Sequence, residues 1–353
     1  MAINRPCGTY DISYDQDMAI LRTRLQWILL IGSLILLLTL PLYSSNYLLY
    51  LVNNICITLI AVVGLNILMG YCGLVSIGQS AFMGIGAYTT GILAHHFGFP
   101  FWFTLPCSAL MAGIIGVIFG LPSLRIKGFY LSMATLASQF IIMTLIMNAD
   151  PELTGGASGL SVPAPKIGDY IFNTQPKMFY LIVPLTIIMI FFSKNIVRTG
   201  TGRAFIAIRD NDLAANVMGV NVFKYKLLAF FICNVFAGVA GCLWAYLMRS
   251  INPEQFTLLD SVWLMGMVFI GGQGSIVGSI FGTIFVRGLD ELVKTITPFL
   301  PALIPQLKAE NVIGFGPVIF AVVLIIFLIY EPRGLAHRWE VFKTSYRLNP
   351  FTY

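Results

Sequence analysis

The sequence has 353 residues, of which 58% are hydrophobic and 10% are charged, and its formal net charge is +6. This composition, with a mean hydropathy of +0.84, excludes a water-soluble globular domain, because long runs almost without charge are typical of transmembrane helices. The basic residues lie mostly in loops beside apolar runs, as the positive-inside rule expects, so the charge does not indicate a nucleic-acid partner. We predict an all-α polytopic membrane protein that contacts membrane lipid.

The first part of the chain predicts four membrane spans, within a transmembrane domain over residues 25–330. Arg22 and Arg24 precede the first apolar run, which places the N-terminal segment, residues 1–24, in the cytoplasm. The spans are expected at about Leu25–Leu42, Tyr47–Met69, Gly73–Ala94 and Phe101–Leu121. The third span is rich in Gly, Ser and Thr, and small residues let helices pack closely in lipid, so we expect it inside the bundle.

Alternating polar and apolar segments continue through the middle of the chain. In order they are a basic turn at Arg125 and Lys127, a span at about Phe129–Met147, an outer loop at 148–177, a span at about Met178–Phe192, a basic loop at 194–226, and a span at about Leu227–Met248. The density of Lys and Arg in the loop 194–226 predicts that it is cytoplasmic.

The last third does not divide cleanly into spans. One run, Ser261–Val286, precedes a final span at Val312–Tyr330, and the basic tail, residues 331–353, should be cytoplasmic, so one crossing is hidden. Glycines predict a broken helix near Gly272, with either two half-helices around it or a partial crossing at Ile296–Ile304. We expect about eight to ten transmembrane or half-helices in total.

The polar segment Gly200–Lys226 predicts a short helix. Asp210, Asn211 or Asp212 can cap its start, and Gly219 can adopt the left-handed conformation that ends it. A helix this short is marginal alone. Leu213, Val217 and Met218 would form an apolar stripe with Ala214 and Ala215 beside it, which suits docking into another protein's groove. The alternative is an ordinary solvated loop with a helical turn.

Motifs for catalysis are absent from the sequence. It contains no G-x-x-x-x-G-K-[ST], no H-E-x-x-H, no G-x-S-x-G and no plausible metal set, so we expect no catalytic residues, no metal and no ATP site in this chain. The clear spans hold almost no ionisable residues, and we place Arg249, Asp260, Arg287 and Asp290 near span ends. Proton- or ion-coupled carriers usually keep ionisable residues inside the membrane, so for a transport protein their absence favours a separate source of energy over a self-contained carrier.

Neutral polar residues within the spans are candidates for a solute path. They are Ser76, Gln79, Ser80 and Thr89 in the third span, with Gln273 and Ser275 at the glycine break. Hydroxyl and amide groups can bind a solute without a buried charge. The alternative is that they form hydrogen bonds between helices, and that Gly274, Gly278 and Gly282 form a packing ridge.

Four stretches together resemble a known family. They are Gly73–Gly91, Leu153–Leu160, Gly202–Phe230, and Ile270–Gly282 with Tyr330–Leu335 (YEPRGL). In this combination and order the sequence resembles the longer permease subunit of the branched-chain amino acid ATP-binding-cassette importers. The resemblance implies a bacterial inner-membrane importer with cytoplasmic termini, a second permease subunit, two cytoplasmic ATPase subunits that bind the ATP, and a periplasmic solute-binding protein.

The resemblance also implies roles for particular residues. Leu213–Gly219 is similar to the later part of the short Ala-Ala-x-x-x-Gly pattern that importers present to their ATPases, although the usual leading Glu is Leu213, with Asp212 one position earlier. Arg203 and Arg209 would flank this helix. Thr154, Gly155, Gly156 and Ser158 of the outer loop would meet the binding protein.

Two questions remain open at this point. Relatives in the family import urea or short amides, so the solute is either a branched-chain or related amino acid or one of these. A function of a different class is a self-contained channel or carrier for a small neutral solute, which would not need the cytoplasmic helix. A membrane enzyme is a distant third candidate, because the sequence shows no set of residues for acid–base catalysis or metal binding.

Overall fold

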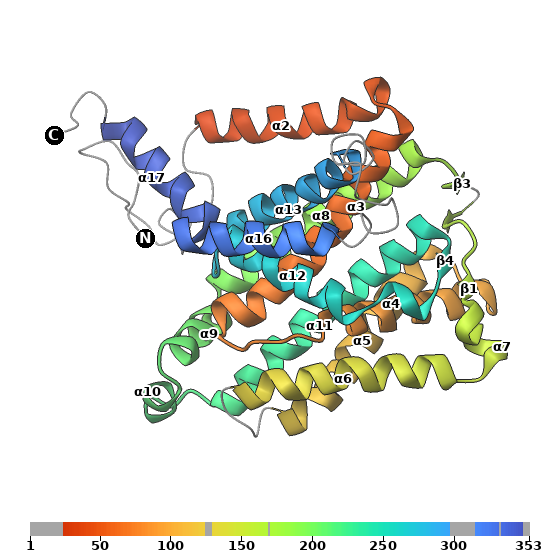
Figure 1. The fold of residues 1–353 in the computed structure, drawn as a ribbon, viewed down its shortest axis with the longest axis horizontal. Coiled ribbons are helices and arrows are strands. Elements are labelled where there is room, and N and C mark those ends of the chain that lie inside the picture. The colour runs from red at the N-terminus through yellow and green to blue at the C-terminus, as the bar shows by residue number, and fades with distance from the viewer. Residues whose placement is uncertain (1–23, 124–128, 169, 297–314, 332, 349–353) are drawn as a thin grey trace, which may run out of the picture. The chain divides into compact units, whose positions relative to one another are not determined.

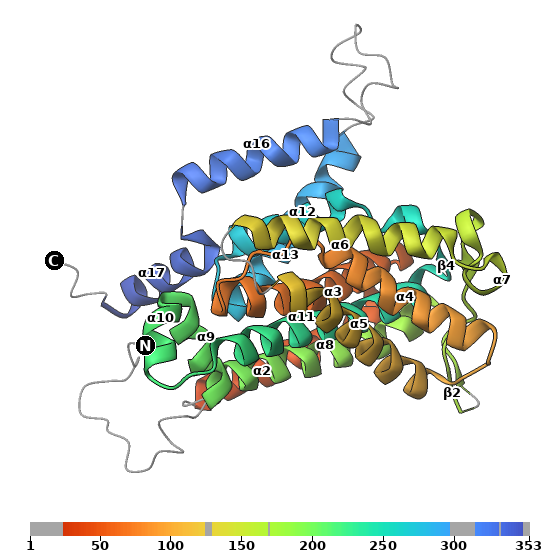
Figure 2. The ribbon, with the colours of Figure 1, turned by 90° about the horizontal axis from the view of Figure 1, so that it is seen from below.

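Helices form most of the computed structural model, which describes residues 24–123, 129–168, 170–296, 315–331 and 333–348 (Figures 1 and 2). The chain divides into two compact units, Met1–Leu49 and Tyr50–Tyr353. The first contains α2 (Arg24–Tyr43), where the first span was expected. The predicted turn at Arg125 and Lys127, the segment before Arg24 and the possible crossing after Ile296 lie outside the described residues.

The longer helices follow the apolar runs of the sequence. They are α3 (Asn46–Asn66) with a π-helical turn (Ile67–Tyr71), α4 (Gln79–His95), α5 (Phe101–Ser123), α6 (Phe129–Asn148), α8 (Gln175–Arg198), α11 (Val222–Met248), α12 (Leu258–Gly271), α13 (Ile276–Ile296), α16 (Phe315–Tyr330) and α17 (Gly334–Leu348). Among the described residues, five helices are long and apolar enough to cross a membrane, namely α3, α5, α6, α8 and α11. The prediction of an all-α polytopic membrane protein is confirmed.

Short elements join these helices at the two ends of the second unit. They are α7 (Pro151–Thr154), a 3-10 turn (Gly156–Ser158), β1 (Leu160–Ser161), β2 (Lys166–Ile167), β3 (Tyr170–Ile171), α9 (Gly200–Asp210), α10 (Asp212–Val217), β4 (Ser250–Ile251) and a 3-10 turn (Pro253–Gln255). β1 pairs antiparallel with β4, and β2 with β3. Figure 1 shows α9, α10 and α17 at one end of the second unit, and α7, β1 and β4 at the other.

The expected third span is wrong in its first part. Residues 72–78 are not helical, and α4 begins only at Gln79. Gly73 has a φ of +74°, which few other residues adopt, and it lies against the Arg209 side chain. α4 is therefore a shortened helix of 17 residues, about 25 Å long, whose N-terminus starts inside the protein. The expectation that it lies inside the bundle is confirmed, because most of its residues are buried.

The basic loop 194–226 is more helical than predicted. α8 continues to Arg198, and α9 follows after one residue. α9 buries Ala204, Phe205 and Ile208 on one side, so an amphipathic pattern and tertiary packing stabilise a segment that starts with two glycines. Only the short α10 was predicted.

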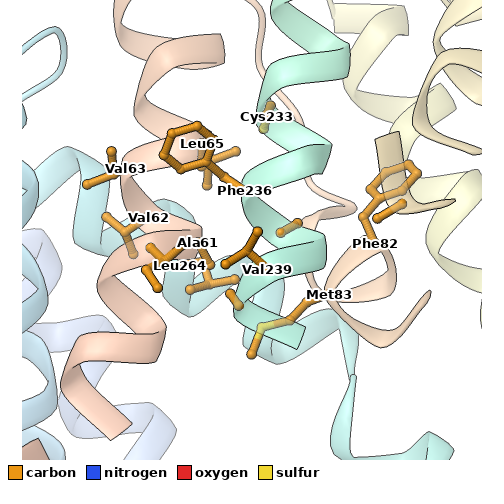
Figure 3. Close-up of a cluster of buried hydrophobic side chains, with 14 of the residues drawn as sticks. Ala61, Val62, Val63, Leu65, Phe82, Met83, Cys233, Phe236, Val239 and Leu264 are labelled. Carbon is orange, nitrogen blue, oxygen red and sulfur yellow. The ribbon is translucent and has the colours of Figure 1, made fainter. Parts of the chain in front are cut away.

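The hydrophobic core lies between α3, α4, α11 and α12. Figure 3 shows buried side chains from these four helices, with Ala61 and Leu65 of α3 beside Phe236 and Val239 of α11. Small residues bring the helices together, because a Cβ on Gly86 of α4 would clash with the backbone of Gly238 of α11. Likewise a Cβ on Gly241 would overlap the Met83 carbonyl oxygen. Close approach of this kind replaces the hydrophobic drive that helices lack in lipid.

Gly241→Val is expected to prevent α4 and α11 from packing, because its side chain has no room beside Met83. We expect a loss of stability above about 4 kcal/mol, seen as loss of the monodisperse peak in detergent gel filtration. Gly288→Val is the matched control, since a Cβ at this helical glycine meets nothing within 4 Å. Equal peaks for the two variants would contradict the close packing.

The helix break near Gly272 is confirmed. α12 ends at Gly271, α13 starts at Ile276, and Gly272 and Gly274 have φ values of +108° and +75°. The two helices form a tight hairpin, because Gly271 lies against Gly278, and a Cβ at Gly282 would overlap the Met267 carbonyl. α12 has 14 residues, about 21 Å, which is less than a hydrocarbon layer of about 30 Å.

The sequence placed Arg287 near the end of a membrane span, and this expectation is wrong. Arg287 lies in the middle of α13, where Nε and one Nη donate hydrogen bonds of 3.2 and 3.0 Å to the hydroxyl oxygen of Thr58 on α3. The Thr58 hydroxyl in turn donates to the Asn54 carbonyl at 2.8 Å. A guanidinium within a helical bundle is held by such polar neighbours.

Candidate functional site

The short helix α10 is built as the sequence predicted. The Asn211 side-chain oxygen accepts hydrogen bonds of 3.0 Å from the N–H groups of Leu213 and Ala214, which caps the start. At the other end Gly219 has a φ of +87°, and its N–H bonds the Asn216 carbonyl. The Val220 N–H bonds the Ala215 carbonyl, which completes a Schellman motif. These bonds hold one turn and a half of helix in a fixed shape.

α10 is anchored on one side and exposed on the other. Ala215 is 4% exposed and faces the protein's own interior, and Lys226 forms an ion pair of 3.5 Å with Asp212. By contrast Leu213, Val217 and Met218 are 67%, 87% and 83% exposed, and Ala214 is exposed too. We call Leu213, Ala214, Val217 and Met218 the α10 face. Large apolar side chains that are exposed on a short, capped helix are candidates for a protein interaction surface.

The two arginines expected to flank α10 differ in position. Arg203 is exposed on α9. Arg209, at the end of α9, donates through one Nη to the Gly70 carbonyl at 3.0 Å, and through Nε and the other Nη to Asp210. Arg209 therefore connects α9 to the end of α3.

Three of the expected path residues lie in a buried polar cluster at the start of α4. The first N–H groups of a helix have no partner within the helix. Here the Ser80 N–H donates to the Ser261 hydroxyl of α12 at 2.9 Å, and the Ala81 N–H donates to the Gln139 side chain of α6 at 2.9 Å. Gln79 Nε2 donates to the Cys233 carbonyl at 3.4 Å. Ser76, Gln79 and Ser80 are all almost completely buried.

Gln139 is the centre of this cluster. Its side-chain oxygen also accepts from the Ser261 hydroxyl at 3.2 Å, and its nitrogen donates to the Phe256 carbonyl at 2.8 Å. The Ile77 N–H donates to Thr135 on the same helix, α6, at 3.1 Å. Side chains of α6 and α12 thus supply partners for the non-helical segment 72–78 and the α4 N-terminus, as irregular backbone within a membrane requires.

The other expected path residues lie elsewhere. Thr89 is half-buried, and its hydroxyl donates to the Ile85 carbonyl of its own helix at 2.7 Å. Gln273 and Ser275 line a cavity of about 800 Å³ between the α12–α13 turn, α16 and α17. Arg333, His337 and Glu340 give this cavity a charged side. The structure therefore divides the six residues between the buried cluster at the α4 N-terminus, the middle of α4 and the α12–α13 turn.

The outer-loop residues form a compact turn rather than an open patch. Thr154 is buried, and its hydroxyl oxygen accepts from the Gly156 N–H at 3.3 Å. Gly155 and Gly156 have positive φ values of +72° and +54°. Ser158 is exposed. β1 then pairs with β4, with Leu160 opposite Ile251, so this loop is fixed to the connection between α11 and α12.

Several residues of these sites were not identified from the sequence, namely Asn66, Gln139 and Ser261. All three are buried: Gln139 and Ser261 bond the start of α4, and Asn66 bonds the α12–α13 turn beside Ser275. The available signal was a single amide in an apolar run, such as Gln139 in LASQFIIM. Within the described part of the chain, no group of three His, Cys, Asp or Glu side chains is placed to hold a metal ion.

Comparison with known proteins gives a family match over most of the chain. The family described as branched-chain amino acid transport system / permease component matches residues 47–329. This interval runs from the start of α3 to the end of α16 and contains α10, the α4 cluster and the α12–α13 turn. No solved structure matches.

Individual relatives include transport permeases that are named for different solutes. The high-affinity branched-chain amino acid transport system permease protein LivM of Escherichia coli (strain K12) is 29% identical over 334 residues, covering 88% of this chain and 75% of the relative. The probable LivM of Methanocaldococcus jannaschii is 25% identical over 65% of this chain and 66% of its own length. The fructose import permease protein FrcC of Rhizobium meliloti is 26% identical over 60% of this chain and 61% of its own length.

Proposed function

The chain belongs to the family of branched-chain amino acid transport permease components, and we propose that it is a membrane-spanning subunit of an ATP-driven importer. The observation that carries this proposal is the α10 face, a capped helix whose large apolar side chains project from the protein. It suits a groove on an ATPase subunit. ATP would be bound by that partner, and this chain would supply the path.

The two ends of the second unit support an orientation for this importer. The end with α9, α10 and α17 carries Arg203, Arg209, Lys226, Arg338 and Lys343. The opposite end, around α7 and the strands β1 to β4, carries fewer basic residues, namely Lys166, Lys177 and Arg249. By the positive-inside rule the α10 end is cytoplasmic, with the C-terminal tail, and the outer loop faces the periplasm of a bacterial inner membrane. There Ser158 and its neighbours would meet the solute-binding protein.

A second permease subunit completes the proposed path. α5 and α6 expose many large apolar side chains, including Trp102, Ile118, Tyr130, Phe140 and Leu145, which need lipid or another membrane subunit as cover.

The polar groups at the α4 N-terminus are bonded within the chain. The α4 helix dipole would still favour the carboxylate of an amino acid near its start.

We infer branched-chain or chemically related amino acids as the solute. The support is the similarity to the E. coli LivM protein over 88% of the chain. The fructose permease relative covers a smaller share of it, 60%. Urea and short amides remain the second candidates, because neutral hydrogen-bonding groups suit them as well.

The test is uptake of radiolabelled leucine by proteoliposomes that hold this chain, the second permease and the ATPase subunits, with the solute-binding protein outside. We expect accumulation only with ATP inside, and competition by excess isoleucine or valine but not by urea or fructose. Uptake of radiolabelled urea but not of leucine by the same proteoliposomes would replace the proposed solute. Uptake by this chain alone without ATP would replace the importer by a self-contained carrier.

A further inference from the structure

We propose that Asn66, Gly70 and Arg209 form a mechanical link that passes movement of the α9–α10 region to the turn Gly272–Ser275 between α12 and α13. The link rests on the proposed function, because it assumes that an ATPase moves α10. Asn66 and Arg209 are positioning residues here and need no contact with the solute.

The link starts where α3 changes into a π-helical turn. The Cys72 N–H reaches back to the Ile67 carbonyl, five residues earlier, at 3.2 Å. Such turns leave carbonyls free to bond elsewhere, and they are frequent at functional sites. The Gly70 carbonyl accepts from Arg209 at 3.0 Å, and Asp210 holds the same guanidinium in place. The end of α9 is thereby attached to Gly70.

Asn66 attaches the same stretch to the α12–α13 turn. Its side-chain nitrogen donates to the Ser275 carbonyl and to the Ser279 hydroxyl, both at 2.8 Å, and its oxygen accepts from the Gly274 N–H at 3.0 Å. Asn66 is 1% exposed. Because both the nitrogen and the oxygen of this amide bond the same turn, Asn66 fixes the position and orientation of the turn.

No side chain separates the two attachments. A Cβ on Gly70 would overlap the Gly274 N–H, and a Cβ on Gly274 would lie 3.2 Å from the Gly70 carbonyl oxygen and 3.3 Å from an Arg209 nitrogen. α9, the π-helical turn and the α12–α13 turn therefore meet at one carbonyl group. Close-packed interiors have low compressibility, so a shift of α9 is transmitted rather than absorbed.

Both ends of the link are tightly packed. α9 is held by buried Phe205 and Ile208, and α10 follows it through the Asn211 cap. On the other side, α12 and α13 form the tight hairpin made by Gly271 and Gly278. A displaced turn would move both helices of the hairpin and reshape the cavity lined by Gln273 and Ser275. This is a physical connection between two elements, as a coupling claim requires.

The test uses the assembled importer in proteoliposomes, with Asn66→Ala beside Asn54→Ala. Asn54 is a half-buried asparagine of the same helix that does not touch the turn. We expect Asn66→Ala to keep the ATPase subunits in a pull-down, to hydrolyse ATP, and to import at least about fivefold less leucine per ATP than Asn54→Ala, the lower range of allosteric coupling.

A thiol reporter at Gln273→Cys gives a second readout. Gln273 is exposed at the turn, so a cysteine in its place can react with maleimide. The labelling rate of this cysteine is obtained by subtracting the rate of the same importer without the reporter. We expect this rate to change when ATP and vanadate trap the ATPases closed. We expect this change to disappear with Asn66→Ala. Arg209→Gln should also abolish the nucleotide-dependent change in labelling. Because the Arg209 side chain is exposed, this variant tests the link if Asn66→Ala does not fold.

The outcomes separate the link from the proposed function. If the wild type retains no ATPase, the proposed function fails and the link with it. If the ATPase is retained but Asn66→Ala and Arg209→Gln keep both the leucine-to-ATP ratio and the nucleotide-dependent labelling of Asn54→Ala, only the link is overturned. Loss of both readouts with the ATPase still bound supports it.

Discussion

Leu213→Asp combined with Val217→Asp is expected to abolish retention of the ATPase subunits by this chain. Both side chains lie on the α10 face and are mostly exposed, so the substitutions leave the interior intact. In an interface each would place a carboxylate in an apolar groove, at a cost of about 2 kcal/mol or more. Together they should weaken binding by more than about 100-fold.

The measurement is a pull-down of co-expressed ATPase subunits on the tagged chain in mild detergent, with the second permease present. Phe342→Asp is the control, because Phe342 is an exposed apolar residue of α17 at the same end of the second unit. It should retain the ATPase. Substitution of Ala215 is less informative, since this residue is buried and its replacement would disturb α10 itself. An ATPase bound equally by wild type and the double variant would refute docking at α10.

Gln139→Leu is expected to destabilise the protein strongly, because Gln139 is the centre of the polar cluster at the start of α4. The change removes the acceptor of the Ala81 N–H and the donor to the Phe256 carbonyl, and both groups are buried. Each buried group left without a partner costs about 1–3 kcal/mol, so we expect about 2–6 kcal/mol in total for the two groups. The readout is the midpoint of thermal unfolding in detergent, followed by gel filtration.

Ser138→Ala is the matched control for this change. Ser138 is also buried on α6, but its hydroxyl donates only to the Thr135 carbonyl of its own helix among the described contacts. Its loss should cost less than about 1 kcal/mol. If Gln139→Leu unfolds at the same temperature as Ser138→Ala, then Gln139 does not hold the start of α4.

Local patterns identified the features that depend on neighbours in the chain. The α10 helix was predictable because its cap at Asn211 and its end at Gly219 act on residues two to five positions away. The α12–α13 break was predictable because Gly272 and Gly274 adopt backbone angles that other residues avoid. These are local energies, and they do not depend on which helix packs against which.

Contacts across the fold changed three expectations. α4 was expected to start at Gly73. Its first free N–H groups donate hydrogen bonds to Ser261 and Gln139, and these bonds stabilise a start at Gln79. α9 forms in an expected loop because its apolar side is buried against the protein. Arg287 is accommodated in the middle of α13 because Thr58, from a helix far away in the sequence, accepts hydrogen bonds from its guanidinium.

The sequence by itself determined the membrane class, the order of the apolar helices, the glycine break and the family resemblance. It did so because hydrophobicity, capping and glycine conformation are properties of single residues and near neighbours. Only the tertiary structure decided which polar groups meet. Asn66 and Gly274, or Gln139 and Ala81, are joined by hydrogen bonds between separate helices, and a buried polar group takes whichever partner packing brings within reach.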